Sequence, residues 1–225
     1  YRTIKSSMHN ALTETGLIPI TFPASPESLL PESFDLTGES WEISQTFNSN
    51  SGKSPFQNAG TCINRRVVTQ RLIPVHKGRP VTLGSILEEE SKVPEEFFIT
   101  ASDLKKWKEH KGAKRLTRTK KNGIEYQYAE GAVAFPEPLD KPSRTIITSE
   151  GGSSPSRFKH VVRTASGRHR RLTPTELERL SGFPRNHTKI DGITDARRAF
   201  FIGNALVTGI VERFGIAAVN NGFFD

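Results

Sequence analysis

Side chains that could do chemistry fall into two groups in this 225-residue chain. The first is a single cysteine, Cys62, in the string Gly-Thr-Cys-Ile, which excludes an intramolecular disulfide framework and a four-cysteine zinc site. A lone cysteine beside apolar residues is more often a small core residue than a nucleophile. The second group is basic, and lysine and arginine are the side chains that neutralise phosphates. The residues by themselves therefore predict no catalytic group and no metal site, and they favour a polyanionic partner.

The basic residues are concentrated in two middle segments. The formal net charge is +8, and the sequence pI is near 9.7. Residues 102–123 and 141–171 together carry a net charge of +14, which leaves −6 for the remainder. A surface that docks on nucleic acid requires such a concentration, although two solvated faces would give the same pattern. An RNA-binding protein is disfavoured, because no aromatic ribonucleoprotein-type motif is present.

Apolar periodicity and turn signals predict the elements that would position these side chains. No apolar run approaches the roughly 20 residues that span a bilayer, so we expect no membrane partner. The expected elements are a helix over 3–17 with Ile4, Met8, Ala11 and Leu12 on one face, a connector of little regular structure over 19–60, a strand or hairpin over 62–75, a helix over 82–89, a helix over 103–111 capped by Ser102, a hairpin of 115–119 with 124–128 around Asn122-Gly123, short strands over 133–135, 145–148 and 158–163, and a flexible glycine loop over 149–155.

The C-terminal third carries stronger helix signals. Thr173-Pro174-Thr175-Glu176 is a capping box with proline at the first helical position, and Gly182 ends the predicted helix. Glu176 and Arg179 are three residues apart, which favours a structural pair. Further helices are expected over 196–201, capped by Asp195, and over 205–214.

Two strings in this region have a distinctive combination of residues. Residues 170–184 contain Arg-x-Leu-Thr-x-x-Glu-x-x-Arg-Leu-x-Gly-Phe-Pro, and residues 203–205 read Gly-Asn-Ala. Earlier, Pro142-Ser143-Arg144-Thr145-Ile146 precedes Gly151-Gly152. The chain resembles DNA cytosine-5 methyltransferases at these places: the first two strings are similar to their ninth and tenth motifs, and the third to the end of their target recognition domain. Asn64-Arg65-Arg66-Val67 is only faintly similar to the eighth motif, and a plain strand with solvated arginines explains it better.

The resemblance implies a fold and a division of the chain. The implied fold is mixed α/β, with a small β-rich target recognition domain followed by C-terminal helices that complete a Rossmann-like, S-adenosylmethionine-dependent methyltransferase domain. The implied segments are an N-terminal helix and connector (1–58), the DNA-binding recognition domain (59–170) and the ninth and tenth motif region (171–225). In this family a cysteine attacks a flipped cytosine, because the ring cannot be reached inside the stack.

The family's chemical strings are absent from these 225 residues. Pro-Cys-Gln, Glu-Asn-Val and Phe-x-Gly-x-Gly do not occur, and Cys62 does not match the nucleophile. We therefore expect a catalytically inactive chain completed by an N-terminal catalytic polypeptide, most readily within a bacterial or phage restriction-modification system in the cytoplasm. The alternative is a stand-alone, sequence-specific DNA-binding module without enzymatic activity.

The resemblance also implies site residues. Double-stranded DNA would be the partner of the basic region, and Gly203, Asn204 and Ala205 would help to wall the S-adenosylmethionine pocket. Arg170 would support the recognition domain or meet a phosphate, and Thr145 would lie near the backbone of the flipped cytidine. The residues expected at the DNA are Arg144, Thr145, Gly151, Gly152, Arg157, Lys159, Arg170 and Arg171.

Overall fold

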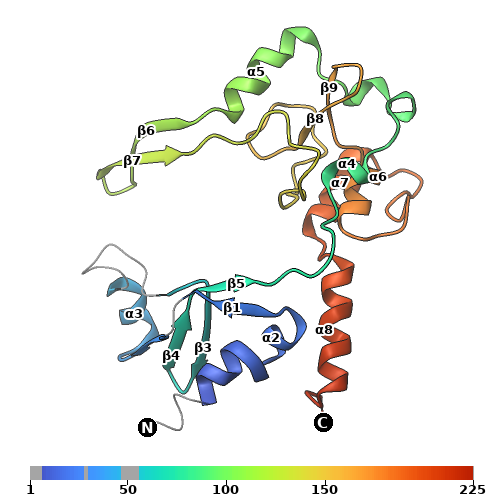
Figure 1. Cartoon of the computed structure of the whole chain (residues 1–225). Coiled ribbons are helices and arrows are strands. Elements are labelled where there is room, and N and C mark those ends of the chain that lie inside the picture. The colour runs from blue at the N-terminus through green and yellow to red at the C-terminus, as the bar shows by residue number, and fades with distance from the viewer. Residues whose placement is uncertain (1–6, 28–29, 47–55, 225) are drawn as a thin grey trace. The chain divides into compact units, whose positions relative to one another are not determined.

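The computed structural model describes residues 7–27, 30–46 and 56–224, which divide into two compact units (Figure 1). Unit 1 comprises residues 1–78 and 211–225, and unit 2 comprises residues 79–210. Both units combine helices with antiparallel strand pairs, so the predicted mixed α/β class is confirmed at that level. The boundaries of these units differ from the expected segments 1–58, 59–170 and 171–225, which describe roles in the enzyme and stay a prediction.

Unit 1 is built around a three-stranded sheet in the order β2-β4-β3, and a second ladder joins β1 to β5. Val67 and Val68 of the central strand are buried, as are Met8 and Leu12 of the first helical segment. Ile4 lies outside the described residues. The elements are a helical turn at residues 7–10, η1 (Ala11–Thr15), α2 (Leu17–Thr21), β1 (Ala24–Pro26), β2 (Glu32–Asp35), α3 (Ser40–Thr46), β3 (Ala59–Ile63), β4 (Arg66–Gln70), β5 (Leu72–Pro74) and most of α8 (Thr208–Asn220).

The expected connector over 19–60 is wrong, because β1, β2 and α3 lie within it and α2 ends within it. The two strands are only three and four residues long, and neither contains a buried residue that would mark an apolar face. Each exists because a distant strand supplies its hydrogen-bonding partner: β1 pairs with β5, and β2 pairs with β4. The β-rich pattern predicted over 62–75 is confirmed by β3, β4 and β5.

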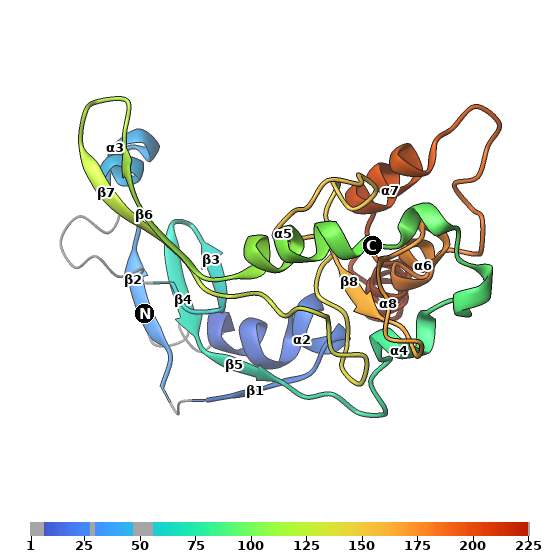
Figure 2. The same ribbon diagram turned by 90° about the horizontal axis from the view of Figure 1, so that it is seen from above.

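Unit 2 holds the recognisable strings, and an apolar cluster joins α4, α6 and α7 to β8. Figure 2 shows the course of these elements. Leu83 and Ile86 of α4 pack in this cluster with Leu177 of α6 and Ile202 of α7. The elements are α4 (Leu83–Ile86), η2 (Glu90–Lys92), η3 (Glu95–Phe97), α5 (Ala101–Lys111), β6 (Lys114–Thr119), β7 (Glu125–Glu130), β8 (Val161–Arg163), β9 (His169–Arg171), α6 (Pro174–Leu180) and α7 (Asp195–Asn204).

Local signals in unit 2 predicted the presence of helices better than their first residues, and predicted short strands poorly. The capping box of α6 is present, and the hairpin β6–β7 is confirmed. The cap of α5 is Thr100 rather than Ser102, and the cap of α7 is Thr194 rather than Asp195. The strands expected over 133–135 and 145–148 are wrong, and that over 158–163 shortens to β8.

The last two helices form one nearly continuous helical segment over residues 195–220, broken only near 205–207. The predicted interruption at Gly203-Asn204 is therefore slightly misplaced, because α7 includes both residues. By length and composition this segment could cross a membrane, a property that the sequence reading did not anticipate. Core helices of soluble proteins can have the same length and composition.

Candidate functional site

The ninth-motif residues build a buried ion pair at the start of α6. Both nitrogens at the end of the Arg170 side chain donate to the Glu176 carboxylate, at 2.8 and 2.7 Å, and both residues are at most 1% exposed. The same carboxylate accepts the backbone N–H groups of Glu88 and Thr173, each at 2.8 Å. A buried charge needs such pairing. The carboxylate is fully satisfied, whereas the buried Nε of Arg170 has no hydrogen-bond partner among the described residues. The expected pair of Glu176 with Arg179 is wrong, because Arg179 donates to the carbonyl of Ile86.

A second buried carboxylate joins α6 to α7. Glu178 accepts hydrogen bonds from Arg198 at 3.1 Å, from the backbone N–H of Thr188 at 2.9 Å and from that of Asn186 at 2.6 Å. Burial opposes ionisation of Glu178, but the hydrogen bonds of Thr188 and Arg198 outweigh it and lower the pKa of the carboxyl. The two motif helices are therefore held together by charge as well as by apolar packing.

A third polar cluster fastens the glycine loop, and the sequence reading missed it. His160 is fully buried, and its Nδ1 lies 2.8 Å from Glu150, whose other oxygen accepts the His160 backbone N–H. The Nε2 of the same ring lies 3.1 Å from the hydroxyl of Ser143. This chain of contacts ties the segment that carries Thr145 to the segment that follows the loop. Glu150 and His160 lie ten residues apart in the sequence and belong to no recognisable motif, so the sequence could not predict that they pair.

The cations expected at the DNA are placed among carbonyl groups of the protein. Lys159 donates to the carbonyls of Gly152 and Ser154, and Arg171 donates to those of Gly151, Gly152 and Glu96. Burial lowers the pKa of the Lys159 ammonium and of the Arg171 guanidinium. Both side chains therefore hold the glycine loop in place. Their contact with DNA stays a prediction, and the structure favours a scaffolding role.

Arg157 and Arg144 also have partners within the protein. Arg157 donates to the carbonyl of Gly112 at 2.8 Å and lies 3.4 Å from the Glu130 carboxylate. Arg144 pairs with the buried Glu137 while a third of its own side chain stays exposed. Together with buried Arg170, these residues have explanations that need no DNA. Of the expected cations, Arg144 has the most exposed side chain in the structure.

Lys111 is a buried lysine that supports the same region. Its Nζ donates to the carbonyl of Arg157 at 2.9 Å and also to that of Lys159, while its side chain is almost wholly covered. Burial is the main reason that the pKa of Lys111 falls to about 8. A neutral amine keeps two N–H groups, enough for the two carbonyls.

We expect the stabilising contribution of Lys111 to grow as pH rises. Its pKa is about 8 in the folded chain, below the ordinary lysine value of 10.5. The cost in folding free energy of burying the protonated Lys111 ammonium is therefore fully present below about pH 8 and is relieved as pH rises from about 8 to 10.5. The measurement is the free energy of unfolding in urea at pH 7.5 and 9.5 for the wild type and Lys111→Met. The free energy of unfolding of the wild type minus that of Lys111→Met should increase at the higher pH, whereas the same difference should not change for the exposed Lys106→Met. Equal differences at both pH values would contradict the assignment.

Two of the predicted site glycines are required by packing. A Cβ atom on Gly151 would lie 2.6 Å from the Cα of Ala196 and 2.7 Å from the Cβ of Ala199. A Cβ on Gly203 would lie 2.5 Å from both the N and the Cα of Thr148. Real Cβ atoms essentially never come so close to a backbone. The glycine loop and α7 thus touch directly, and this contact accounts for both glycines without a ligand.

A cavity of about 580 Å³ opens beside this contact, lined by the tenth-motif segment, the end of α6 and the segment of Thr145. Gly203 and Ala205 line it, whereas Asn204 is absent from the lining and donates its amide to the carbonyl of Phe200 at 2.9 Å. The described lining residues include two arginines and no carboxylate. The lining is Val81, Ile86, Ser143, Arg144, Thr145, Ile146, Arg179, Leu180, Ser181, Gly182, Ile202, Gly203, Ala205, Val207, Thr208 and Gly209.

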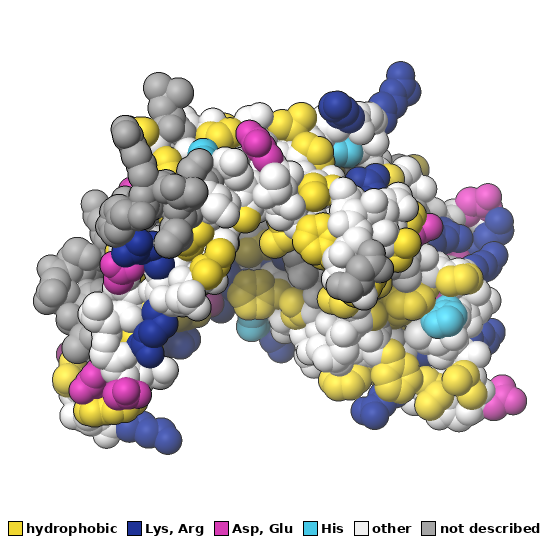
Figure 3. Space-filling model, turned by 90° about the horizontal axis from the view of Figure 1, so that it is seen from below, with side chains coloured by type: hydrophobic (Ala, Val, Ile, Leu, Met, Phe, Trp, Pro, Cys, Tyr) yellow, Lys and Arg dark blue, Asp and Glu magenta, His cyan; other side chains and the backbone are white. Residues whose placement is uncertain are grey.

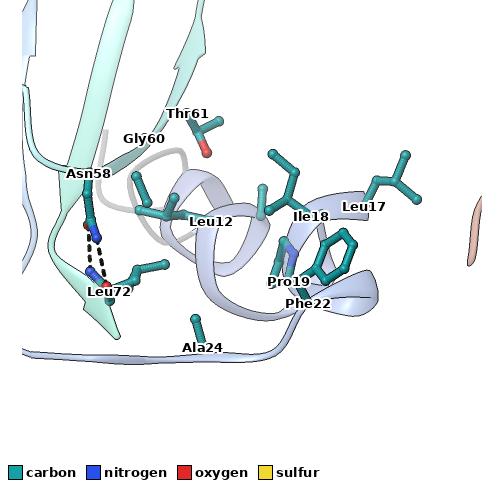
Figure 4. A pocket seen from close by; sticks show the side chains of 13 residues that line it. Leu12, Leu17, Ile18, Pro19, Phe22, Ala24, Asn58, Gly60, Thr61 and Leu72 are labelled. Carbon is teal, nitrogen blue, oxygen red and sulfur yellow. Dashed lines mark hydrogen bonds between the residues drawn. The ribbon is translucent and has the colours of Figure 1, made fainter. Parts of the chain in front are cut away.

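Unit 1 has a separate, mostly apolar cavity of about 540 Å³ between its helices and its strands (Figure 4). Leu12, Ile18 and Phe22 line it, and the amide of Asn58 makes two hydrogen bonds of 2.8 Å to the backbone of Leu72. No charged side chain belongs to its described lining, which makes it a poor place for a phosphate.

The exposed cations lie elsewhere. Figure 3 shows lysine and arginine side chains that stand out from the surface of the molecule. On the hairpin β6–β7 the basic residues are exposed from Arg115 onward, and most of those on α5 are exposed as well. The basic stretch 102–123 therefore supplies accessible charge, whereas much of the charge in 141–171 is engaged inside unit 2.

The comparisons with known proteins agree with these motifs. Residues 31–219 match the family described as C-5 cytosine-specific DNA methylase. The chain is 39% identical over 160 residues to the Type II methyltransferase M.Sau3AI of Staphylococcus aureus, an alignment that covers 71% of this chain and 37% of that protein. Among solved structures, it is similar to the methyltransferase EhMeth of Entamoeba histolytica (16% identity, 87% of this chain, 54% of that chain, TM-score 0.42) and to the S. pombe Dnmt2 methyltransferase (13%, 87%, 57%, TM-score 0.44).

The ninth-motif helix packs against α7, and the glycine loop packs against α7 as well. The chain belongs to the C-5 cytosine-specific DNA methylase family, as the resemblance implied. It spans a little over a third of the length of the curated relative that it matches.

Proposed function

We propose that this chain is the DNA-recognition portion of a DNA (cytosine-5) methyltransferase of a bacterial restriction-modification system, acting in the cytoplasm. It would hold double-stranded DNA while a cytosine is flipped out and methylated. Another polypeptide would supply the catalytic cysteine and the main cofactor loop. The absence of Pro-Cys-Gln and Phe-x-Gly-x-Gly from these 225 residues supports this division.

The observation that carries the proposal is the exposed apolar end of the tenth-motif region. Leu206 is 74% exposed and Val207 is 41% exposed, beside a cavity that both motifs line. Phe200 and Phe201 of α7 are exposed as well. Apolar residues gathered in this way mark a surface that packs against another protein segment. We assign that surface to the missing catalytic portion, because the relative has well over half its length outside the aligned part.

S-adenosylmethionine would be the methyl donor, but this chain's residues do not complete a site for it. Two of the three expected contacts, Gly203 and Ala205, line the cavity, and Asn204 does not. The donor carries a positive sulfonium, and the described lining offers arginines without a carboxylate to balance it. The pocket would therefore need walls and charges from the catalytic polypeptide, and the contribution of this chain would be limited to one side.

The test is complementation. We expect no transfer of a labelled methyl group from S-adenosylmethionine to duplex DNA by this chain, and transfer at least a hundredfold above background after mixing with a polypeptide that carries the missing motifs. The matched control is the same mixture with the cysteine of Pro-Cys-Gln replaced by serine in that polypeptide. If both polypeptides are folded and the mixture stays inactive, the proposal is wrong.

The stand-alone DNA-binding alternative makes a different prediction. It requires sequence-selective binding of duplex DNA by this chain, with no gain from the catalytic polypeptide or the methyl donor. Gel shifts at increasing salt measure the phosphate contacts, which give a linear fall of log K with log salt concentration in either case. Methyl transfer after addition of the catalytic polypeptide distinguishes the two, because only the enzyme portion gains it.

A further inference from the structure

We propose that the hairpin β6–β7 is the element that reads base identity, entering the major groove of duplex DNA with its face of Arg115, Thr117 and Gln127 toward the base edges. This inference rests on the proposed function and assigns specificity within it. It moves the reading surface away from the arginines and lysines around the glycine loop, whose side chains are engaged with the protein.

The shape of the hairpin suits a DNA groove. Six residues of β6 pair with six of β7 in an antiparallel register that runs from Lys114 opposite Glu130 to Thr119 opposite Glu125. Figures 1 and 2 show this ribbon extending as an arm from the rest of unit 2. Most of its side chains are exposed. The major groove, about 12 Å wide, admits a two-stranded ribbon.

One face of the ribbon is occupied by contacts within the ribbon. Arg118 lies 3.5 Å from the centre of the Tyr128 ring, and Lys120 lies 5.9 Å from that of Tyr126. The hydroxyl of Tyr128 donates to the Glu130 carboxylate. Alternation along a strand places these side chains together on one side, which we call the tyrosine face. Because Arg118 and Lys120 lie against tyrosine rings, they can still contact phosphates but are poorly placed to reach the base edges.

The opposite face carries mostly polar side chains, and we call it the threonine face. It presents Arg115, Thr117 and Thr119 from β6, because residues directly opposite one another project to the same side. From β7 it presents Gln127, Ala129 and, toward the turn, Glu125, a carboxylate that can accept from the cytosine amino group. The amide nitrogen of Gln127 donates to the hydroxyl of Thr117 at 2.9 Å, which orients the amide. Glutamine recognises adenine, arginine recognises guanine, and the threonine methyl group contacts that of thymine. This face therefore carries the side chains that direct readout needs.

Charge favours a polyanion at this arm. Residues 114–130 hold five basic residues against two acidic ones, a net charge of +3. One of the acidic residues, Glu130, is engaged at the base of the hairpin by Arg157. Lys120 and Lys121 lie at the turn, where both are exposed and can reach phosphates on either side of the groove.

The hairpin has a firm base. The backbone N–H of Val133 donates to the carbonyl of Lys111 at 2.9 Å, and the side chain of Lys111 is anchored on the segment of Arg157 and Lys159. Both strands therefore start from a buried polar cluster. A reading element gains precision from such a rigid base.

The experiment selects sequences from a random duplex library with the full 225-residue chain. The wild type should select a defined sequence, and Gln127→Ala or Arg115→Ala should lose discrimination at one or two base pairs by about 5- to 150-fold. Lys120→Ala/Lys121→Ala should instead weaken binding to every duplex and reduce the salt slope by about 2. The control Lys141→Ala/Lys189→Ala removes two exposed cations of unit 2 outside the hairpin and should leave specificity and the salt slope unchanged. Circular dichroism melting verifies that each variant is folded.

The outcomes separate this inference from the function on which it rests. A wild-type chain that binds no duplex overturns both. A wild type that selects a sequence and supports methyl transfer, with folded hairpin variants that select the same sequence with the same discrimination, overturns the inference alone. The inference is also overturned if the hairpin binds single-stranded DNA or RNA in preference to duplex DNA through its tyrosines. The same holds if the hairpin variants no longer bind the catalytic polypeptide but still bind DNA.

Discussion

Replacing Glu176 by alanine is expected to lower the free energy of unfolding by about 3–5 kcal/mol. The substitution leaves the Arg170 guanidinium at 1% exposure with no carboxylate beside it. It also strands the backbone N–H groups of Glu88 and Thr173, which the same carboxylate accepts. Urea unfolding of the purified chain measures the loss directly. DNA and the methyl donor are not needed, because the pair lies wholly inside unit 2.

The companion to this variant is Arg170→Met with Glu176→Leu. Removing both charges leaves no unpaired ion, so the double variant should recover much of the loss, although the two backbone N–H groups remain without their acceptor. A matched control is Glu109→Ala on the exposed side of α5, which should change stability by no more than about 0.5 kcal/mol. If Glu176→Ala lowered the free energy of unfolding no more than the control does, the ion pair would contribute nothing to stability. The phosphate contact expected for Arg170 would then be favoured again.

How far the sequence predicts this structure depends on how local each determinant is. The capping box of α6 and the Asn-Gly turn of the hairpin lie within a few residues, and both were predicted correctly. Strands β1 and β2 are stabilised by β5 and β4, which lie more than thirty residues away in the chain. Their own residues show no apolar alternation, so no local pattern could have identified them.

The same distinction explains the site. The motif strings identified the family, but not the burial of their side chains, which depends on tertiary packing. Glu176 can pair with Arg170 or with Arg179 by spacing alone, and only the buried position of Arg170 against the start of α6 decides between them. Lys159 and Arg171 belong to a basic segment, yet the carbonyls that they bind come from the glycine loop. Net charge located a basic region without telling its buried cations from its exposed ones.

The glycines of the motifs show most clearly how packing and ligand binding can be confused. Gly203 was expected to wall a methyl-donor pocket, and it does line the cavity. Its lack of a side chain is nevertheless required by Thr148, whose backbone occupies the space that a Cβ would need. The two explanations predict different effects of replacing Gly203 by alanine. A role in the pocket wall predicts weaker binding of the methyl donor, whereas a packing role predicts lower stability without any ligand.

Gly203→Ala is expected to destabilise the chain by about 3 kcal/mol in the absence of any methyl donor, because the new Cβ forces α7 away from the backbone of Thr148. The matched control is Gly209→Ala: this glycine lines the same cavity, but a Cβ there meets nothing within 4 Å. Since Gly209 lies in the first turn of α8, alanine should leave stability unchanged or raise it by up to about 1 kcal/mol. Thermal and urea unfolding of both variants without ligand decide the matter. If Gly203→Ala keeps its full stability and loses only methyl-donor binding in the complemented enzyme, the glycine serves the ligand and the packing explanation is wrong.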